Sequence, residues 1–182
     1  MGQYYYAVTS LPQLFFESDN FPPMDEFLNL CRENLTGRDQ RAIEDAYGML
    51  VENDLHRGAK AEVLFKEWID WNLSLRVELA SLRAQTLRWD SEELQDIERI
   101  IGTEEAAREI YTQDTPLAAE DLLERYRWAK LDALEVGHYF DLKKLIVYMI
   151  RLSILTRRAQ FARDVGEENF SRMYETIRRT KI

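Results

Sequence analysis

The stretch from Ala59 to about Leu87 carries apolar side chains at intervals of three and four residues over many turns. This spacing places them on one side of an α-helix, whereas a half-buried β-strand would show strict alternation. The apolar positions form two adjacent stripes: Leu64, Trp68, Trp71, Leu75, Leu79 and Leu82, and Ile69, Leu73, Val77, Ala80, Ala84 and Leu87. So broad an apolar face predicts a long central helix that is packed on several sides.

A second long helix is predicted from Phe140 to about Val165. Its residues 145–150 read Leu-Ile-Val-Tyr-Met-Ile and are apolar all round, so we expect this to be the most buried element. The run is far shorter than the roughly 18 apolar residues that a membrane span needs. We therefore expect a buried helix and no membrane-spanning segment.

The rest of the chain also has helical periodicity, with its 7 glycines and 4 prolines near the ends of the patterns. We predict shorter helices over 24–35, 39–56, 90–101, 103–111, 116–136 and 167–179, with Asp90 and Thr115 at helix starts and Gly37, Gly58, Gly137 and Gly166 just past helix ends. The N-terminal segment is expected to be short and helical or extended. The predicted fold is an all-α helical bundle with two long central helices, a single domain over 1–182 with candidate sub-units 1–88 and 89–182.

Two segments of the predicted long helices resemble each other. Residues 75–85 read LRVELASLRAQ and residues 150–160 read IRLSILTRRAQ. Each carries an arginine followed seven residues later by Arg-Ala-Gln, which gives the pairs Arg76/Arg83 and Arg151/Arg158. Because seven residues are two helical turns, the members of each pair share a stripe. We interpret the pairs as equivalent positions in two pseudo-repeated helical units.

These arginines lie among apolar residues, and two interpretations are open. Their stems cover the edge of the core while their guanidinium groups reach water. Alternatively, the guanidinium groups pair with carboxylates inside the bundle or on a partner. Trp68 and Trp71 lie at core spacing, which favours a packing role over a ligand cage.

The formal net charge of −9 argues against non-specific binding to nucleic acid, which depends on neutralising phosphates. The charge is uneven, since residues 151–182 carry eight Lys/Arg and four Asp/Glu in a chain that has 24 and 33 in all. A basic C-terminal region on an acidic body is a candidate docking surface for an acidic protein. A solvated final helix explains the same composition equally well.

Residues typical of catalytic or metal sites are scarce. With two histidines and one cysteine, a zinc site is nearly excluded. Glu135-x-x-His138 matches half of a di-iron motif, but Gly137 should break the helix there, so we expect His138 to be a hydrogen-bonded boundary residue. Cys31 is expected in the core. We therefore expect no enzyme activity, no metal or other cofactor and no small-molecule substrate.

The opening YYYAVTSLPQL and the later HYFDLKKLIVYMIRLSILTRRAQF resemble a bacterial family encoded among genes for V-type (A-type) ATP synthases. Within the second segment, Tyr148, Arg151 and Arg157 fit the family's pattern, and a middle segment from Trp68 to Arg76 also fits. The resemblance implies a C-like (d-like) subunit, an all-helical socket between the membrane rotor ring and the central stalk. It also implies that Arg157 joins the candidate arginines and that Tyr148 is structural.

The resemblance therefore implies a non-catalytic rotor-coupling subunit of a proton- or sodium-translocating V/A-type ATPase. Its partners would be subunits of the central stalk and rotor ring, and it would be cytoplasmic, attached to the membrane through its complex. The chain is notably shorter than a usual C subunit, so it would supply part of such a socket. The alternative is a free-standing cytoplasmic helical adaptor or chaperone that binds a peptide or protein in a groove between helices.

Overall fold

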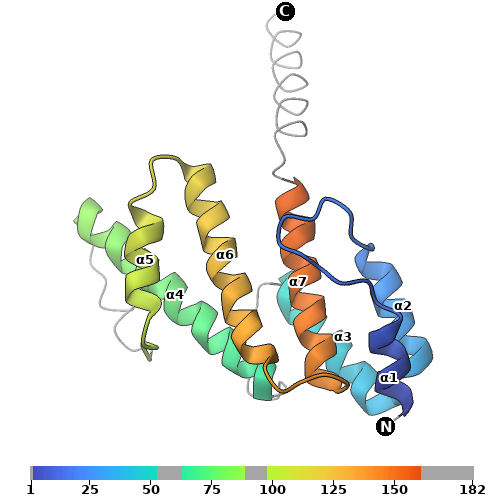
Figure 1. Cartoon of the computed structure of the whole chain (residues 1–182). Coiled ribbons are helices and arrows are strands. Elements are labelled where there is room, and N and C mark those ends of the chain that lie inside the picture. Colours follow the sequence, from blue (N-terminus) through green and yellow to red (C-terminus); the bar gives the residue numbers. More distant parts are fainter. Residues whose placement is uncertain (1, 53–62, 89–97, 161–182) are drawn as a thin grey trace, which may run out of the picture.

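A computed structural model of the chain describes residues 2–52, 63–88 and 98–160. These residues form seven α-helices and no β-strand, so the predicted all-α fold is confirmed. The helices are α1 (Gly2–Thr9), α2 (Met24–Asn34), α3 (Gly37–Glu52), α4 (Val63–Leu87), α5 (Thr103–Tyr111), α6 (Pro116–Glu135) and α7 (Leu142–Gln160) (Figure 1).

Local capping explains where several helices begin and end. Thr115 is the N-cap of α6, where its hydroxyl accepts a hydrogen bond from the Ala118 backbone N–H at 3.1 Å, and Pro116 occupies the first turn. Gly137, just past the end of α6, has a φ of 84°, a conformation that glycine adopts without strain. Asp141 accepts a hydrogen bond from the Lys144 N–H at 2.9 Å, which fixes the start of α7 at Leu142 rather than Phe140.

Two details of the predicted helix pattern differ in the structure. Gly37 was expected past a helix end, but it opens α3, because the last turn of α2 closes at Leu35 in an extended conformation. Three described helices are long, with 25 residues in α4, 20 in α6 and 19 in α7, so the expected two long helices are not confirmed. Asp90, Gly58, Gly166 and the predicted helix over 167–179 lie outside the described residues.

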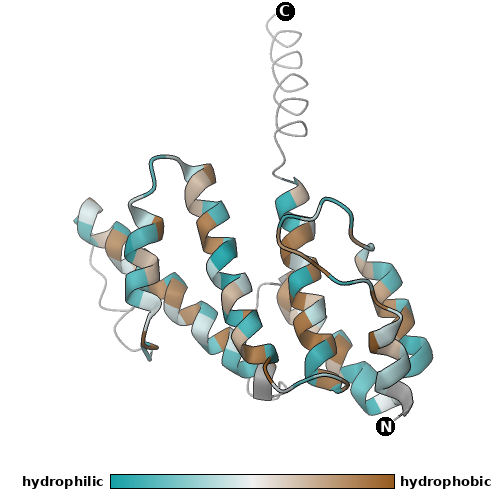
Figure 2. Ribbon diagram, viewed as in Figure 1, coloured by the Kyte–Doolittle hydropathy of each residue, from teal (hydrophilic) through white to brown (hydrophobic). Residues whose placement is uncertain are grey.

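The helices pack in two groups that meet along α6 and α7. Helices α4, α5 and α6 contact one another, while α1, α2 and α3 gather around α7 (Figure 1). Each helix carries both apolar and polar positions at helical spacing, as expected where one side of the helix is buried (Figure 2). This grouping crosses the proposed sub-unit boundary at residue 88, since α4 packs with α5 and α6.

Each group of helices has its own core. The larger core contains all of residues 145–150 of α7, as predicted, together with residues of α1, α2, α3, the first half of α4 and the second half of α6. The smaller core joins Leu75 and Leu79 of α4 to α5 and to Leu123 of α6. Trp68 and Trp71 are both buried, one in each core, so α4 passes through both.

Cys31 lies in the larger core with 1% of its surface exposed. Burial raises the pKa of its thiol to about 12. A thiol in this state is poorly nucleophilic, which agrees with a packing role. Among the described helices none combines the length and the apolar character that crossing a bilayer requires.

Candidate functional site

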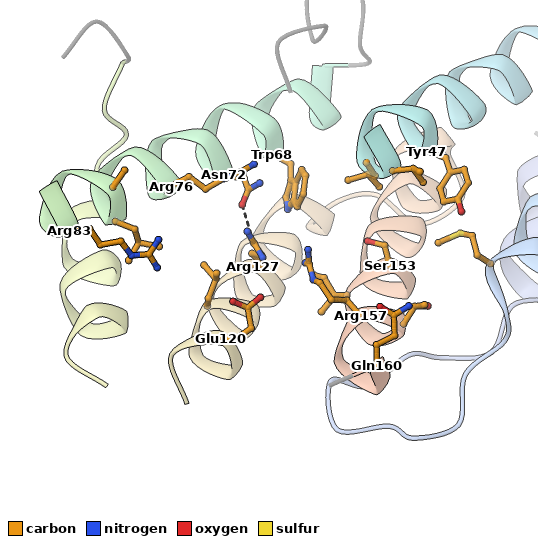
Figure 3. A pocket seen from close by; sticks show the side chains of 18 residues that line it. Tyr47, Trp68, Asn72, Arg76, Arg83, Glu120, Arg127, Ser153, Arg157 and Gln160 are labelled. Carbon is orange, nitrogen blue, oxygen red and sulfur yellow. Dashed lines mark hydrogen bonds between the residues drawn. The ribbon is translucent and has the colours of Figure 1, made fainter. Parts of the chain in front are cut away.

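A cleft of about 730 Å³ lies between the two groups of helices. Its walls come from α3, α4, α6 and α7, and Met24 of α2 also lines it (Figure 3). The apolar part of the lining includes Leu50, Trp68, Leu79, Leu123 and Ile154. This volume falls in the range of ligand pockets, and the cleft is partly open to solvent.

The cleft is basic although the whole chain is acidic. Arg76 and Arg83 of α4, Arg127 of α6 and Arg157 of α7 line it, and Glu120 is the acidic residue among the described lining residues. Figure 3 shows these four arginines spread along the cleft, on the three helices α4, α6 and α7 that border it. Several cations that line one cleft create a positive potential that attracts anionic groups.

A buried polar network lies at the bottom of the cleft. Arg127 donates hydrogen bonds to Asn72 Oδ1 at 2.9 Å and to Glu124 Oε1 at 2.8 Å. Arg157 pairs with the same Glu124 oxygen at 2.6 Å. Burial raises the pKa of the Glu124 carboxyl above its ordinary value, an effect that the two guanidinium groups oppose, and burial lowers the pKa of Arg127. The network links all three helices that line the cleft's basic part.

Several buried polar atoms near the cleft have no hydrogen-bond partner among the described residues. They are Nε1 of Trp68, Nε of Arg157 and Oε2 of Glu124. Buried polar groups in proteins are nearly always satisfied, so each such group requires an explanation. Trp68 and Arg157 both line the cleft, and their unused N–H groups are donors available to a bound molecule.

The two arginine pairs singled out in the sequence have different surroundings. Arg76 and Arg83 are exposed in the cleft, whereas Arg151 and Arg158 are largely buried between α7 and its neighbours. Arg151 pairs with Asp132 at 2.5 Å and Glu135 at 2.8 Å. The equivalence of the two pairs as repeated units stays a prediction.

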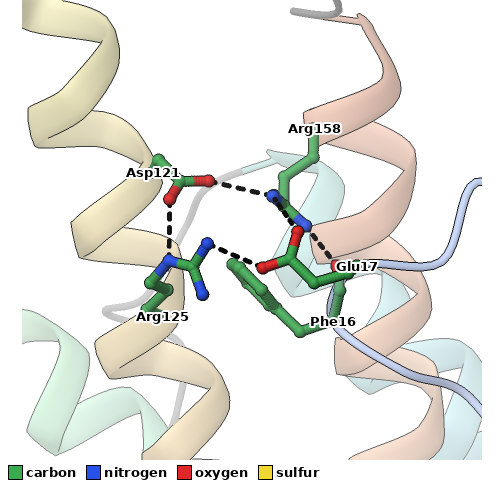
Figure 4. A network of polar contacts seen from close by, with 5 residues as sticks. All are labelled: Phe16, Glu17, Asp121, Arg125 and Arg158. Atoms are coloured by element: carbon green, nitrogen blue, oxygen red, sulfur yellow. Dashed lines mark hydrogen bonds and ion pairs between the residues drawn. The ribbon is translucent and has the colours of Figure 1, made fainter.

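Arg158 is the centre of a second polar network, drawn in Figure 4. It pairs with Asp121 of α6 at 2.9 Å and donates to the carbonyl oxygen of Phe16 in the loop after α1. Arg125 pairs with Asp121 at 2.8 Å and with Glu17 at 2.6 Å. The two guanidinium groups lie over the Phe16 ring, 3.7 Å and 4.8 Å from its centroid. The network fixes this loop to α6 and α7.

Together these contacts form a ladder of ion pairs between antiparallel α6 and α7. From one end to the other, Asp121 pairs with Arg158, Glu124 with Arg157, Asp132 and Glu135 with Arg151, and Glu135 with Lys144. Burial alone would raise the pKa of Glu135, but hydrogen bonds from Lys144 and Arg151 outweigh it and hold that pKa below its ordinary value. Hydrogen bonds from Arg125 and Arg158 likewise hold the pKa of Asp121 below its ordinary value, although burial alone would raise it.

Both residues of the half-motif Glu135-x-x-His138 have side-chain partners in the structure. Glu135 is engaged by Lys144 and Arg151, and the His138 Nδ1 lies 2.6 Å from Asp141. His138 therefore has the boundary role predicted for it. No group of three His, Cys, Asp or Glu side chains suited to a metal ion occurs in the part of the chain that the structure describes.

The sequence reasoning did not single out Glu124, Arg127 or Asn72. A signal for Arg127 was available, because it falls at helical spacing within the buried stripe Leu123, Leu131 and Leu134 of α6. A charged residue in an apolar stripe needs a buried partner. No comparable signal marks Asn72, whose partner is 55 residues away along the chain. Tyr148, expected to be structural, is buried and stacks on Phe27 with ring centroids 5.3 Å apart.

A second surface feature lies at the turn between α6 and α7. The rings of Tyr5 and Phe140 are in contact, with centroids 5.0 Å apart. Both are exposed, as are Val136 and Tyr139 in the same turn. We call these four residues the aromatic patch. Exposed apolar groups that lie close together are a feature of protein association sites.

A family model described as "Protein of unknown function (DUF2764)" matches residues 46–181. The match covers α4 to α7 and part of α3, and so includes all four arginines of the cleft. No curated protein and no solved structure matches the chain.

Proposed function

The chain belongs to the DUF2764 family of proteins of unknown function, and we propose that it is a non-catalytic rotor-coupling subunit of a V/A-type ATPase. In this role it would join the central stalk to the membrane rotor ring, on the cytoplasmic side of the membrane. The proposal takes up the resemblance of the opening segment and of the segment around α7 to the C-like subunits of these machines.

The observation that carries the proposal is the ion-pair ladder along α6 and α7. The segment that resembles the family lies mostly on α7, and Arg151, Arg157 and Arg158 of that segment are all engaged by carboxylates of α6. A part that transmits torque must resist deformation. Side-by-side helices held by a close-packed core and by repeated charge-assisted contacts meet that requirement.

The aromatic patch supports a role in an assembly. It consists of exposed rings and an exposed valine on α1 and in the turn between α6 and α7, and none of its residues lines the basic cleft. A coupling subunit needs two separate contact surfaces, one for each neighbour. The patch and the cleft are two such surfaces of different chemistry.

Purification from native membranes tests the proposal. We expect a tagged protein to bring down central-stalk and rotor-ring subunits, and we expect Tyr139→Ser to weaken that recovery severalfold. Leu117→Ser, which removes an equally exposed apolar group from the opposite end of α6, is the matched control. The proposal fails if no ATPase subunit is recovered and if deletion of the gene leaves assembly and ion pumping unchanged.

The basic cleft favours a second candidate, a free-standing helical adaptor that binds a protein segment. The two candidates differ in what co-purifies. An adaptor would bring down partners other than ATPase subunits, and its cleft variants would lose them while ATP-driven ion pumping stays at the wild-type level.

A further inference from the structure

We propose that the basic cleft between α4, α6 and α7 binds an acidic amphipathic helix of a protein partner. The inference rests on the proposed function in one respect, since both hold that the protein works by binding other proteins. It adds the surface and the chemistry of the bound segment.

Charge is the first argument. Among the residues that the structure describes, four arginines line the cleft against Glu120, and they outnumber the acids four to two when the buried Glu124 is counted. Glu124 neutralises part of the charge of Arg127 and Arg157. Arg76 and Arg83 are the exposed members of this set. The complementary ligand carries several negative charges.

The spacing of these charges selects an elongated ligand. Arg76 and Arg83 are two turns apart on α4, which separates them by roughly 10 Å along the helix axis. Arg157 lies on the facing wall of the cleft, on α7 (Figure 3). One phosphate group contacts donors that converge within a few ångströms, so it would reach only part of this set. Carboxylates seven residues apart on a helix have the same two-turn separation as the arginines of α4.

The apolar lining gives the ligand its second property. Leu79 and Ala80 lie between the two arginines along α4, and Leu123 and Ile154 line the cleft from α6 and α7. A bound helix would place apolar side chains on these residues and carboxylates toward the arginines. This is the usual pattern when an amphipathic helix binds in a groove.

Trp68 is an independent sign of a bound molecule. Its side chain is 5% exposed and lines the cleft, and its indole N–H has no acceptor within the described ranges. Figure 3 shows the ring between α4 and α7 at the inner end of the cleft. A carboxylate or carbonyl oxygen of the partner would satisfy this donor.

Binding of synthetic helical peptides to the full chain tests the inference. The probe is a stapled helix with glutamates seven residues apart and leucines between them, and its charge-reversed counterpart carries lysines in place of the glutamates. We expect the acidic peptide to bind and the lysine peptide not to bind, with affinity that falls as salt rises. Arg76→Gln and Arg83→Gln should each weaken binding about three- to fivefold, and together about tenfold or more, as partly exposed ion pairs do.

Arg108→Gln is the matched control, because Arg108 forms an exposed pair with Glu104 on α5, outside the cleft. It should bind the acidic peptide as the wild type does. A double charge swap tests for a gain of function, since Arg76→Glu/Arg83→Glu leaves two arginines against four acids among the described residues and should acquire affinity for the lysine peptide. Thermal unfolding of each variant verifies that the fold is intact.

Three results would overturn the inference: equal binding of the two peptides, wild-type affinity in the Arg76→Gln/Arg83→Gln variant, or displacement of the peptide by tripolyphosphate at lower concentration than by free acidic peptide. The last would assign the cleft to a compact anion. If these results are found while ATPase subunits still co-purify, the inference fails and the proposed function stands. If the peptide binds as expected but no ATPase subunit is recovered, the helix-binding role of the cleft is supported and the proposed rotor-coupling function fails.

Discussion

Tyr148 combines good packing with an unsatisfied polar atom. Its ring stacks on Phe27, and its hydroxyl is buried without a hydrogen-bond partner among the described residues. Burial raises the pKa of this hydroxyl to about 12. A buried hydroxyl without a partner lowers stability, because its hydration is lost on folding and not replaced.

Removing that hydroxyl should therefore not lower the stability of the fold. We expect Tyr148→Phe to leave the free energy of unfolding unchanged or to raise it by up to about 1 kcal/mol. Tyr148→Ala, which also removes the ring, should lower it by about 3–5 kcal/mol. Urea unfolding of both variants measures the difference, and a loss of more than about 1 kcal/mol in Tyr148→Phe would show that the hydroxyl has a partner.

Glu124 is the common acceptor of two arginines, and its loss should be costly. Glu124→Gln leaves the buried Arg127 and the partly exposed Arg157 without their shared counter-charge, and we expect the free energy of unfolding to fall by about 3–5 kcal/mol, mainly because of Arg127. Glu44→Gln breaks an exposed pair with Arg32 and should change stability little. Chemical denaturation of the two variants side by side checks this, and equal effects would contradict it.

Single residues were predictable from the sequence where helical spacing alone decided their position. Trp68, Trp71 and Cys31 fall on apolar stripes and are buried. The partners of the arginines were not predictable, because Arg157 meets Glu124 only once α6 and α7 have packed together. Periodicity shows which face of a helix is buried, and it carries no information about the helix opposite.

At the scale of elements, the ladder between α6 and α7 makes stability depend on pH. The pKa of Glu135 is held below its ordinary value of about 4.3 in the folded protein, so the unfolded chain binds more protons in acid. The stabilisation from this group is therefore complete above that ordinary value. It is lost as the pH falls through the depressed pKa of the folded state.

We expect the free energy of unfolding of the wild type to fall between about pH 5 and pH 3, in the range where ordinary carboxyl groups titrate. In Glu135→Gln the free energy of unfolding should fall less over this pH range, because the glutamine side chain has no charge to lose. Urea unfolding at several pH values measures both curves. Parallel curves for the two proteins would show that Glu135 does not contribute.

The start and end of an element were predictable where a capping residue marks them. Thr115 and Gly137 bound α6 at the expected places. The prediction for Gly37 was wrong, because glycine next to a helix boundary can lie at a start as well as at an end. Deciding between these needs the backbone conformation, which is extended at Leu35 and leaves no role for a left-handed residue.

At the scale of the whole molecule, the presence of two cores predicts that a mutation in one core loosens mainly the helices that pack around that core. Leu75 and Leu145 are both fully buried, the first in the smaller core and the second in the larger. We expect Leu75→Ala to accelerate amide hydrogen exchange mainly in α5 and in the second half of α4. Leu145→Ala should act mainly on α2, α3 and α7. Exchange that rises equally everywhere in both variants would mean that the cores open as one unit.

The fold class followed from the sequence, but the arrangement of the helices did not. Apolar residues at helical spacing and scarce turn residues were sufficient for the all-α prediction. The cleft is lined by residues from Met24 to Gln160, and it exists only because two groups of helices meet. No local pattern contains that information, so the basic character of the cleft emerged from the structure.

Helix α4 runs without interruption through both cores, with Trp68 in one and Trp71 in the other. Changing the angle between the two groups of helices would bend α4 and break its backbone hydrogen bonds, which a flexible loop in the same place would not require. The cleft therefore has nearly its final width before any ligand arrives. A helix that enters it loses its own freedom of movement but does not have to order the protein, and this preorganisation lowers the entropic cost of binding.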